Sequence, residues 1–198
     1  MIAKKAALKL PSHKQALALL NKFHVPSNIM EHSLLVNKVA MKIAKDLAKK
    51  IDVNIKLVDR ASLLHDLFKY IEFNADELDV FCRKIKEKYK GMSHEEAAYR
   101  FFLYDYPELA KVILNHGYKS IDKLNSIEEK IVYYADKRVM HNKIVSLTER
   151  LAEGHRRHAQ KTKSFDYDST KKIDSKIFAL EKELFTYLNY NPSLLNKL

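Results

Sequence analysis

The stretch ASLLHDLFKY, residues 61–70, places two ionisable side chains, His65 and Asp66, inside an apolar pattern with helical spacing. We predict a helix over 54–68 that carries this pair at its C-terminal end. Because burying an isolated ionisable group is costly, such a pair needs a partner. A metal ion partners several groups at once, since neutral imidazoles and carboxylates are standard ligands of transition metals.

Four more residues of the same two kinds lie before and after this stretch, each beside an apolar helical face or at a predicted helix end. They are His32, His94, His116 and Asp136. His32 lies on the apolar seam of a helix predicted to begin near Ser27. Helix ends are places where several helices converge on one ion, which favours a shared metal site.

The ordered set resembles the HD superfamily of metal-dependent phosphohydrolases. Its signature is an early His, a later His-Asp pair and a distant Asp, which match MEHSLLV (30–36), LLHDLFK (63–69) and YYADKRV (133–139). The resemblance covers residues 28–150 and implies an all-α fold, an HD-type helical bundle of about seven to nine helices. The segments SHEEAA and ILNHGY resemble the places of two extra histidines in binuclear members of the superfamily.

This resemblance implies divalent transition metal ions as cofactors, two in number, with Asp66 as a catalytic residue that bridges them. The predicted ligands are His32, His65, Asp66, His94, His116 and Asp136. The sequence does not distinguish Fe, Mn, Ni, Co or Zn, because His and Asp ligands accept all of them.

Three basic residues near these ligands are candidates for phosphate binding. Lys69 lies three residues after Asp66, on the same face if the helix continues, and the resemblance implies that it faces the substrate phosphate and assists catalysis. Lys137 and Arg138 follow Asp136 directly, and an arginine can grip a phosphate through two hydrogen bonds.

Composition and apolar spacing support a helical protein. We also predict helices over 74–89 and about 142–161, and two that begin after Ser93 and Ser126, each of which has a glutamate three residues later. The 198 residues include 46% hydrophobic ones but only 3 Gly and 4 Pro, which is few for strands and tight turns. We expect residues 1–150 to form the HD domain and 151–198 a helical extension packed on it. A single cysteine, Cys82, forms no internal disulfide, which favours a reducing cytoplasm. No apolar run approaches the length of a membrane span.

The net charge of +11 favours an anionic partner, and the metal site makes a phosphorylated small molecule such as a nucleotide the first choice. Nucleic acid is a secondary partner. A lysine-rich surface also serves solubility alone, because the lysines are spread along the chain. The sequence leaves the oligomeric state open.

We therefore expect hydrolysis of a phosphoester or phosphoanhydride, in a nucleotide or dinucleoside polyphosphate, by a metal-bound hydroxide. The chain looks most like small stand-alone HD hydrolases, including bacterial symmetrical diadenosine tetraphosphate hydrolases. Leu67 and Phe68 replace the Ile-Gly of the strict HDIG pattern, which disfavours cyclic dinucleotide hydrolysis. Two alternatives stay open: a non-catalytic HD module that binds nucleotide or nucleic acid, and a di-iron HD oxygenase.

Overall fold

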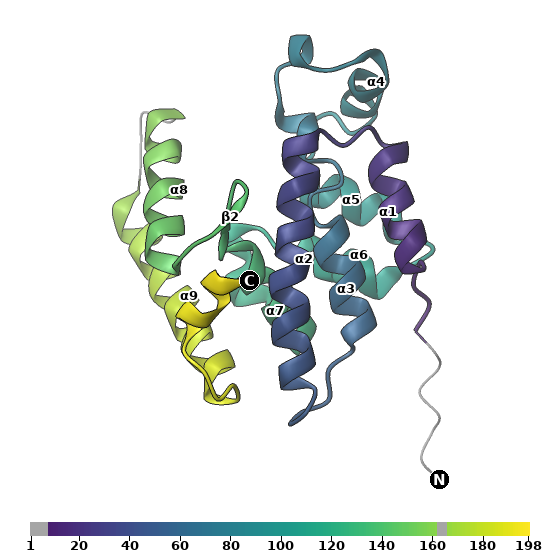
Figure 1. Cartoon of the computed structure of the whole chain (residues 1–198). Coiled ribbons are helices and arrows are strands. Elements are labelled where there is room, and N and C mark those ends of the chain that lie inside the picture. The colour runs from purple at the N-terminus through teal and green to yellow at the C-terminus, as the bar shows by residue number, and fades with distance from the viewer. Residues whose placement is uncertain (1–7, 162–165) are drawn as a thin grey trace.

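The computed structural model describes residues 8–161 and 166–198, which fold into a bundle of α-helices (Figure 1). The helices of these described residues are α1 (His13–Lys22), α2 (Ser27–Leu47), α3 (Ile55–Leu64), α4 (Val80–Lys88), α5 (His94–Phe102), α6 (Pro107–Leu114), α7 (Ile127–Asp136), α8 (Leu147–Lys161) and α9 (Tyr167–Thr186). This architecture confirms the all-α helical bundle that the sequence predicted.

Short elements connect the α-helices. Four 3-10 helices are η1 (Lys69–Glu72), η2 (Ala75–Glu77), η3 (Tyr118–Lys123) and η4 (Pro192–Lys197) in the described part of the chain. The two strands described, β1 (Val139–Met140) and β2 (Lys143–Ile144), pair antiparallel as a small hairpin after α7. Within these same residues, no helix combines the length and the apolar character needed to cross a bilayer.

Local sequence explains where the site-bearing helices begin. Ser93 accepts a hydrogen bond from the backbone of Glu96, whose side chain accepts one from the backbone N–H of Ser93. Ser126 and Glu129 form the same reciprocal pair at the start of α7. Such capping boxes satisfy backbone donors that a helix start leaves free. They fix the start of α5, at His94, and the start of α7, whose last residue is Asp136.

The core lies between α2 and its neighbours. Helix α2 crosses the middle of the molecule in Figure 1 and packs against α3 and α7. Its buried face includes Val36, Val39, Ile43 and Leu47, and their spacing by three or four residues is typical of the apolar side of a helix. Removing this much apolar surface from water is the main stabilising contribution. The same burial brings the ends of α3 and α7 beside α2.

The C-terminal helices α8 and α9 lie along one side of the bundle in Figure 1, where α9 packs against α7 and η3. Leu180 and Leu184 are among the α9 side chains that reach the core. The last residues then return toward α2, where the backbone carbonyl of Leu198 accepts a hydrogen bond from Lys38.

Three local predictions differ from the structure. The helix expected over 54–68 ends at Leu64, and the chain turns before the 3-10 helix η1. The helix expected over 74–89 is divided, because Asp79 caps a new start at Val80. The helix expected over 142–161 begins at Leu147, after the β1–β2 hairpin. In each case a short-range turn or cap interrupts an apolar pattern that alone looks continuous.

Candidate metal centre

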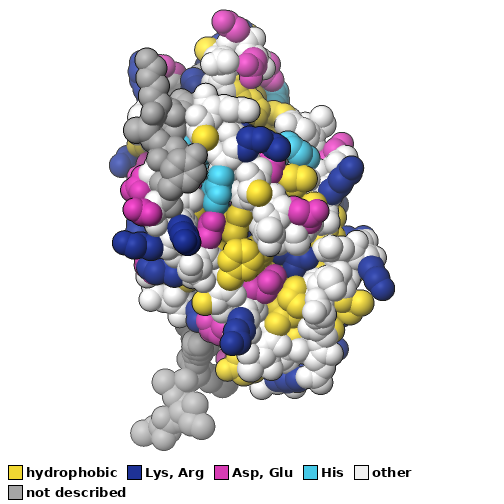
Figure 2. Space-filling model, turned by 90° about the vertical axis from the view of Figure 1, so that its left-hand side faces the viewer, with side chains coloured by type: hydrophobic (Ala, Val, Ile, Leu, Met, Phe, Trp, Pro, Cys, Tyr) yellow, Lys and Arg dark blue, Asp and Glu magenta, His cyan; other side chains and the backbone are white. Residues whose placement is uncertain are grey.

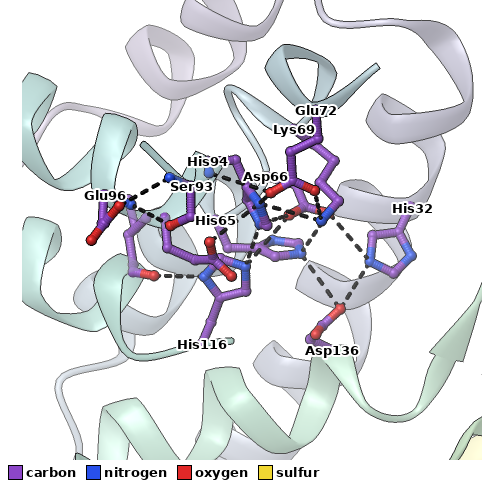
Figure 3. Close-up of polar contacts among 12 residues, drawn as sticks. His32, His65, Asp66, Lys69, Glu72, Ser93, His94, Glu96, His116 and Asp136 are labelled. Atoms are coloured by element: carbon purple, nitrogen blue, oxygen red, sulfur yellow. Dashed lines mark hydrogen bonds and ion pairs between the residues drawn. The ribbon is translucent and has the colours of Figure 1, made fainter. Parts of the chain in front are cut away.

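Five of the bundle's helices, with the turns that follow two of them, bring the six predicted ligands together (Figure 3). His32 comes from α2, His65 and Asp66 from the end of α3, His94 from the start of α5, His116 from the turn after α6 and Asp136 from the last residue of α7. The side chain of His65 is fully buried, and even that of His32 is only 14% exposed. The cluster therefore lies in a largely desolvated place where charges must compensate one another.

The carboxylate of Asp66 lies between two pairs of histidines. Its Oδ1 is 3.0 Å from Nε2 of His94 and 3.4 Å from Nε2 of His116. Its Oδ2 is 3.6 Å from Nε2 of His65 and 3.9 Å from Nε2 of His32. Each oxygen thus belongs to a separate group of three potential ligands. A carboxylate in this position is suited to bridge two cations.

Asp136 joins the first of these groups. Its Oδ1 lies 3.0 Å from Nε2 of His32 and 3.7 Å from Nε2 of His65. Its other oxygen accepts a hydrogen bond of 2.6 Å from Lys137, which also donates to the backbone carbonyl of His116. Because one acceptor belongs to Asp136 and the other to His116, Lys137 holds together two segments that carry predicted ligands.

Two of the predicted ligand histidines have their tautomer set by the backbone. Nδ1 of His65 donates to the carbonyl of Ser62 at 2.9 Å, and Nδ1 of His116 donates to that of Ile113 at 2.5 Å. Since a carbonyl only accepts, each Nδ1 carries a proton, so in the neutral imidazole that binds a metal each Nε2 presents the lone pair. Nε2 of His65 is buried, and no hydrogen-bond partner in the described part of the chain reaches it. A buried lone pair aimed at two carboxylates fits a cation.

The electrostatics of the site also fit a cation. Burial raises the pKa of Asp66, but attraction to the protonated ring of His65 and hydrogen bonds from the protonated rings of His116 and His94 outweigh it and hold that pKa well below its usual range. For Asp136, burial is likewise outweighed, by Lys137 and then by His32 and His65. Two buried carboxylates that stay ionised require positive charge beside them, as divalent ions supply.

Lys69 lies at the edge of the site. Its Nζ is 2.9 Å from Oε2 of Glu72 and 3.3 Å from Nδ1 of His94, and its side chain is 34% exposed. Burial lowers its pKa, but the charges of Asp66 and Glu72 raise it above the ordinary value, so the ammonium stays protonated at neutral pH. The α-helix ends at Leu64, so Lys69 does not share a helical face with Asp66, and the turn into η1 brings this cation to the predicted ligands instead.

Arg138 is committed elsewhere. Its side chain is 1% exposed and donates to the carbonyls of Val145 and Pro192, to Tyr134 Oη and to Asn196 Oδ1. These partners tie the end of α7 to the hairpin and the C-terminal segment. The structure thus gives Arg138 a structural place where the sequence predicted phosphate binding, because the C-terminal partners could not be foreseen.

Two acidic residues of the site, Glu72 and Glu95, were not predicted from the sequence. Glu72 Oε1 is 2.5 Å and Glu95 Oε2 is 3.3 Å from Nδ1 of His94. Burial raises the pKa of Glu72, but the hydrogen bond from His94 and the charges of His94 and Lys69 lower it to about 2. The one available signal was the adjacency of Glu95 to His94. Nothing local in the sequence places Glu72 beside Glu95 or His94.

The fold and the paired His/Asp cluster define a helical-bundle protein with a site of the kind that holds divalent metals. A family model described as HD domain matches residues 29–140, more than half of the chain and a range that includes all six predicted ligands. The chain belongs to the HD domain family. The assignment of the six residues as metal ligands stays a prediction, although the structure brings all six side chains together.

Part of the chain is similar in sequence to a curated relative. The dihydroneopterin 2',3'-cyclic phosphate phosphodiesterase of Methanocaldococcus jannaschii is 31% identical to this chain over 144 residues. The match covers 63% of this chain and 51% of that protein, so the chain spans about half the length of this relative. No solved structure shows a significant match.

Proposed function

We propose that this chain is a metal-dependent phosphohydrolase that cleaves a phosphoester or phosphoanhydride of a small phosphorylated molecule. The observation that carries the proposal is the division of the Asp66 carboxylate, with Oδ1 facing His94 and His116 and Oδ2 facing His65 and His32. Family membership and the phosphodiesterase named above support it.

The proposed site takes two divalent ions. One position is lined by His32, His65, Asp136 and Oδ2 of Asp66, and the other by His94, His116 and Oδ1 of Asp66. Ions held there would lower the pKa of a coordinated water and neutralise charge on the reacting phosphate. His65 and His116 are preorganised for this role, because their Nδ1 donors are already satisfied by backbone carbonyls.

Lys69 is the proposed phosphate-binding and charge-stabilising residue. It is part-exposed, protonated and within 3.3 Å of a ligand histidine, so it presents a fixed positive charge at the mouth of the site. A donor preorganised at the place where negative charge develops favours the transition state over the substrate. Lys137 contributes indirectly by holding Asp136, and Arg138 is not part of this proposal.

A nucleotide or dinucleoside polyphosphate is the proposed substrate, with a cyclic phosphodiester as the second candidate because the curated relative is named for one. The face shown in Figure 2 has lysine and arginine side chains interspersed with acidic ones rather than gathered in one basic stripe. A protein surface that binds the phosphate backbone of a nucleic acid needs such a stripe. On this face, therefore, the charge pattern favours a small anion over nucleic acid.

The proposed organisation assigns this chemistry to a domain of residues 1–150, with 151–198 as a helical extension packed on it. Helix α9 supports this division, since it packs mainly on α7 and η3. The buried, unpaired Cys82 fits a reducing compartment, and the cytoplasm is the proposed location.

The test is an activity panel with elemental analysis. Purified protein is stripped of metal, reconstituted separately with Mn, Fe, Co, Ni or Zn, and assayed on nucleotides, diadenosine tetraphosphate, a 2',3'-cyclic nucleotide and bis-p-nitrophenyl phosphate. We expect turnover that depends on added metal and is lost with chelator. Bound metal without cleavage of any phosphoester would contradict the proposal in favour of a binding module. Oxygen uptake with iron would contradict it in favour of an oxygenase.

A further inference from the structure

The ligand histidines of this site are oriented in two different ways. His65 and His116 both follow the C-terminal end of a helix, and each donates from Nδ1 to a carbonyl three residues earlier. Helix C-termini leave such carbonyls without an intrahelical partner, so they are available as acceptors. Backbone geometry alone therefore sets both rings.

His94 is in the opposite situation, as the first residue of α5. No earlier helical turn stands before it to offer a free carbonyl, because a helix N-terminus presents N–H groups instead. A side chain from η1, 22 residues earlier, takes this place: Glu72 Oε1 is 2.5 Å from Nδ1 of His94 and 3.4 Å from its backbone N–H. In Figure 3 the labelled Glu72 and Lys69 lie on the side of His94 away from His116.

We infer that Glu72 is a positioning residue for the metal position formed by Asp66, His94 and His116. By accepting the Nδ1 proton of His94, Glu72 leaves Nε2 as the lone-pair nitrogen that faces Oδ1 of Asp66 at 3.0 Å. A carboxylate behind a ligand imidazole fixes its tautomer and raises its basicity. This inference rests on the proposed binuclear site and adds to it the residue that orients His94.

The other oxygen of Glu72 gives the same residue a second role. Oε2 accepts from Lys69 at 2.9 Å, while Oε1 is occupied by His94. Glu72 therefore connects a ligand histidine to the lysine proposed to meet the substrate phosphate. A change at this carboxylate is expected to affect both metal binding and the use of substrate.

A third ion among Glu72, His94 and Glu95 is the competing interpretation, because their ligand atoms lie close together. A neutral imidazole has one lone-pair nitrogen, and in His94 Nε2 already faces Asp66 and His116. An ion bound at Nδ1 would compete with that role. Glu95 also lies close to Gly117 on its other side, where an added Cβ would meet its Oε1 at 2.7 Å. Orientation of His94 is the interpretation consistent with all these contacts.

The test is a Mn²⁺ titration by calorimetry of wild-type protein and three variants of Glu72, each checked for helicity by circular dichroism. We expect Glu72→Ala to weaken one of two binding constants about 10–100-fold and to leave the other unchanged within a factor of two. Glu72→Gln keeps an acceptor at the same reach, whereas Glu72→Asp keeps the charge on a shorter side chain. Positioning predicts that Gln retains more affinity than Asp.

The control is Glu87→Ala, because Glu87 is also ion-paired to a lysine three residues away but lies on exposed α4. It should bind both ions as wild type does. Unchanged affinities in Glu72→Ala and Glu72→Asp, with two ions bound to wild type, would overturn the positioning role and leave the proposed function standing. One ion or none in wild type would overturn the binuclear site and this inference with it. If Glu72→Ala misfolds, the metal affinities of Glu72→Gln and Glu72→Asp decide: an affinity of the Gln variant no higher than that of the Asp variant would overturn the positioning role.

Discussion

Replacing Lys69 by methionine should slow phosphoester hydrolysis while leaving metal content intact. Removing one preorganised donor from a developing oxyanion costs about 2–4 kcal/mol of transition-state stabilisation. Two features of the structure favour the lower end of this range. The Lys69 side chain is 34% exposed, and the carboxylate of Glu72, 2.9 Å from its Nζ, partly neutralises the ammonium charge. We therefore expect a loss of about 2 kcal/mol, which is about thirty-fold in kcat/KM.

The assay compares kcat/KM for bis-p-nitrophenyl phosphate between wild type and Lys69→Met at equal metal occupancy, measured by elemental analysis. Lys90→Met is the matched control, because Lys90 is also paired to a glutamate three residues away but is 76% exposed on the surface. It should retain full activity. A Lys69→Met enzyme with wild-type kcat/KM and full metal content would refute the reasoning, since the charge would then play no part in the transition state.

Three further predictions concern stoichiometry, pH and stability. The double variant His94→Gln/His116→Gln should hold about one ion where wild type holds two, by elemental analysis; an unchanged ratio would leave these residues as helix-end structure. The pKa of Asp79 is lowered from 3.8 to about 2 by the backbone N–H of Cys82 and by His24. Its folded pKa lies below the unfolded one, so its contribution is present above about pH 4 and lost as pH falls toward 2. In urea titrations, wild type should therefore be more stable than Asp79→Asn at pH 6, and the difference should disappear near pH 2; a difference independent of pH would contradict this. Arg138→Met should destabilise the fold by about 3 kcal/mol, because it leaves buried acceptors unpaired. An equal effect of exposed Arg83→Met would show that the buried contacts are not the cause.

The sequence predicts the helical segments well where capping chemistry is local. Ser93 and Ser126, each followed by a glutamate three residues later, begin α5 and α7 where expected. It fails where a turn interrupts an apolar run. The end of α3 at Leu64 is one example, since Leu67 and Phe68 continue the apolar pattern into a turn and are buried there. Burial in a turn and burial in a helix have the same pattern over so short a span.

The candidate site divides in the same way. Its six central residues are predictable because each is a metal-ligand type in a known order, and the structure places them together. Glu72 was not predictable, because only the η1 turn brings it to His94. The buried contacts of Arg138 were not predictable either, since Pro192 and Asn196, which accept from its guanidinium, lie more than 50 residues away in sequence. Long-range contacts of this kind follow from tertiary packing and leave no local signal.

The central claim is that Asp66 joins two metal positions and that hydrolysis depends on them. The most direct measurement determines bound metal and phosphoester turnover together in wild type, Asp66→Ala and the exposed control Asp76→Ala, with helicity verified by circular dichroism. We predict two ions and metal-dependent turnover in wild type and in Asp76→Ala. Asp66→Ala should hold fewer ions and show no detectable turnover, because it removes a ligand from both positions. A folded Asp66→Ala protein that keeps both ions and wild-type turnover would contradict the account.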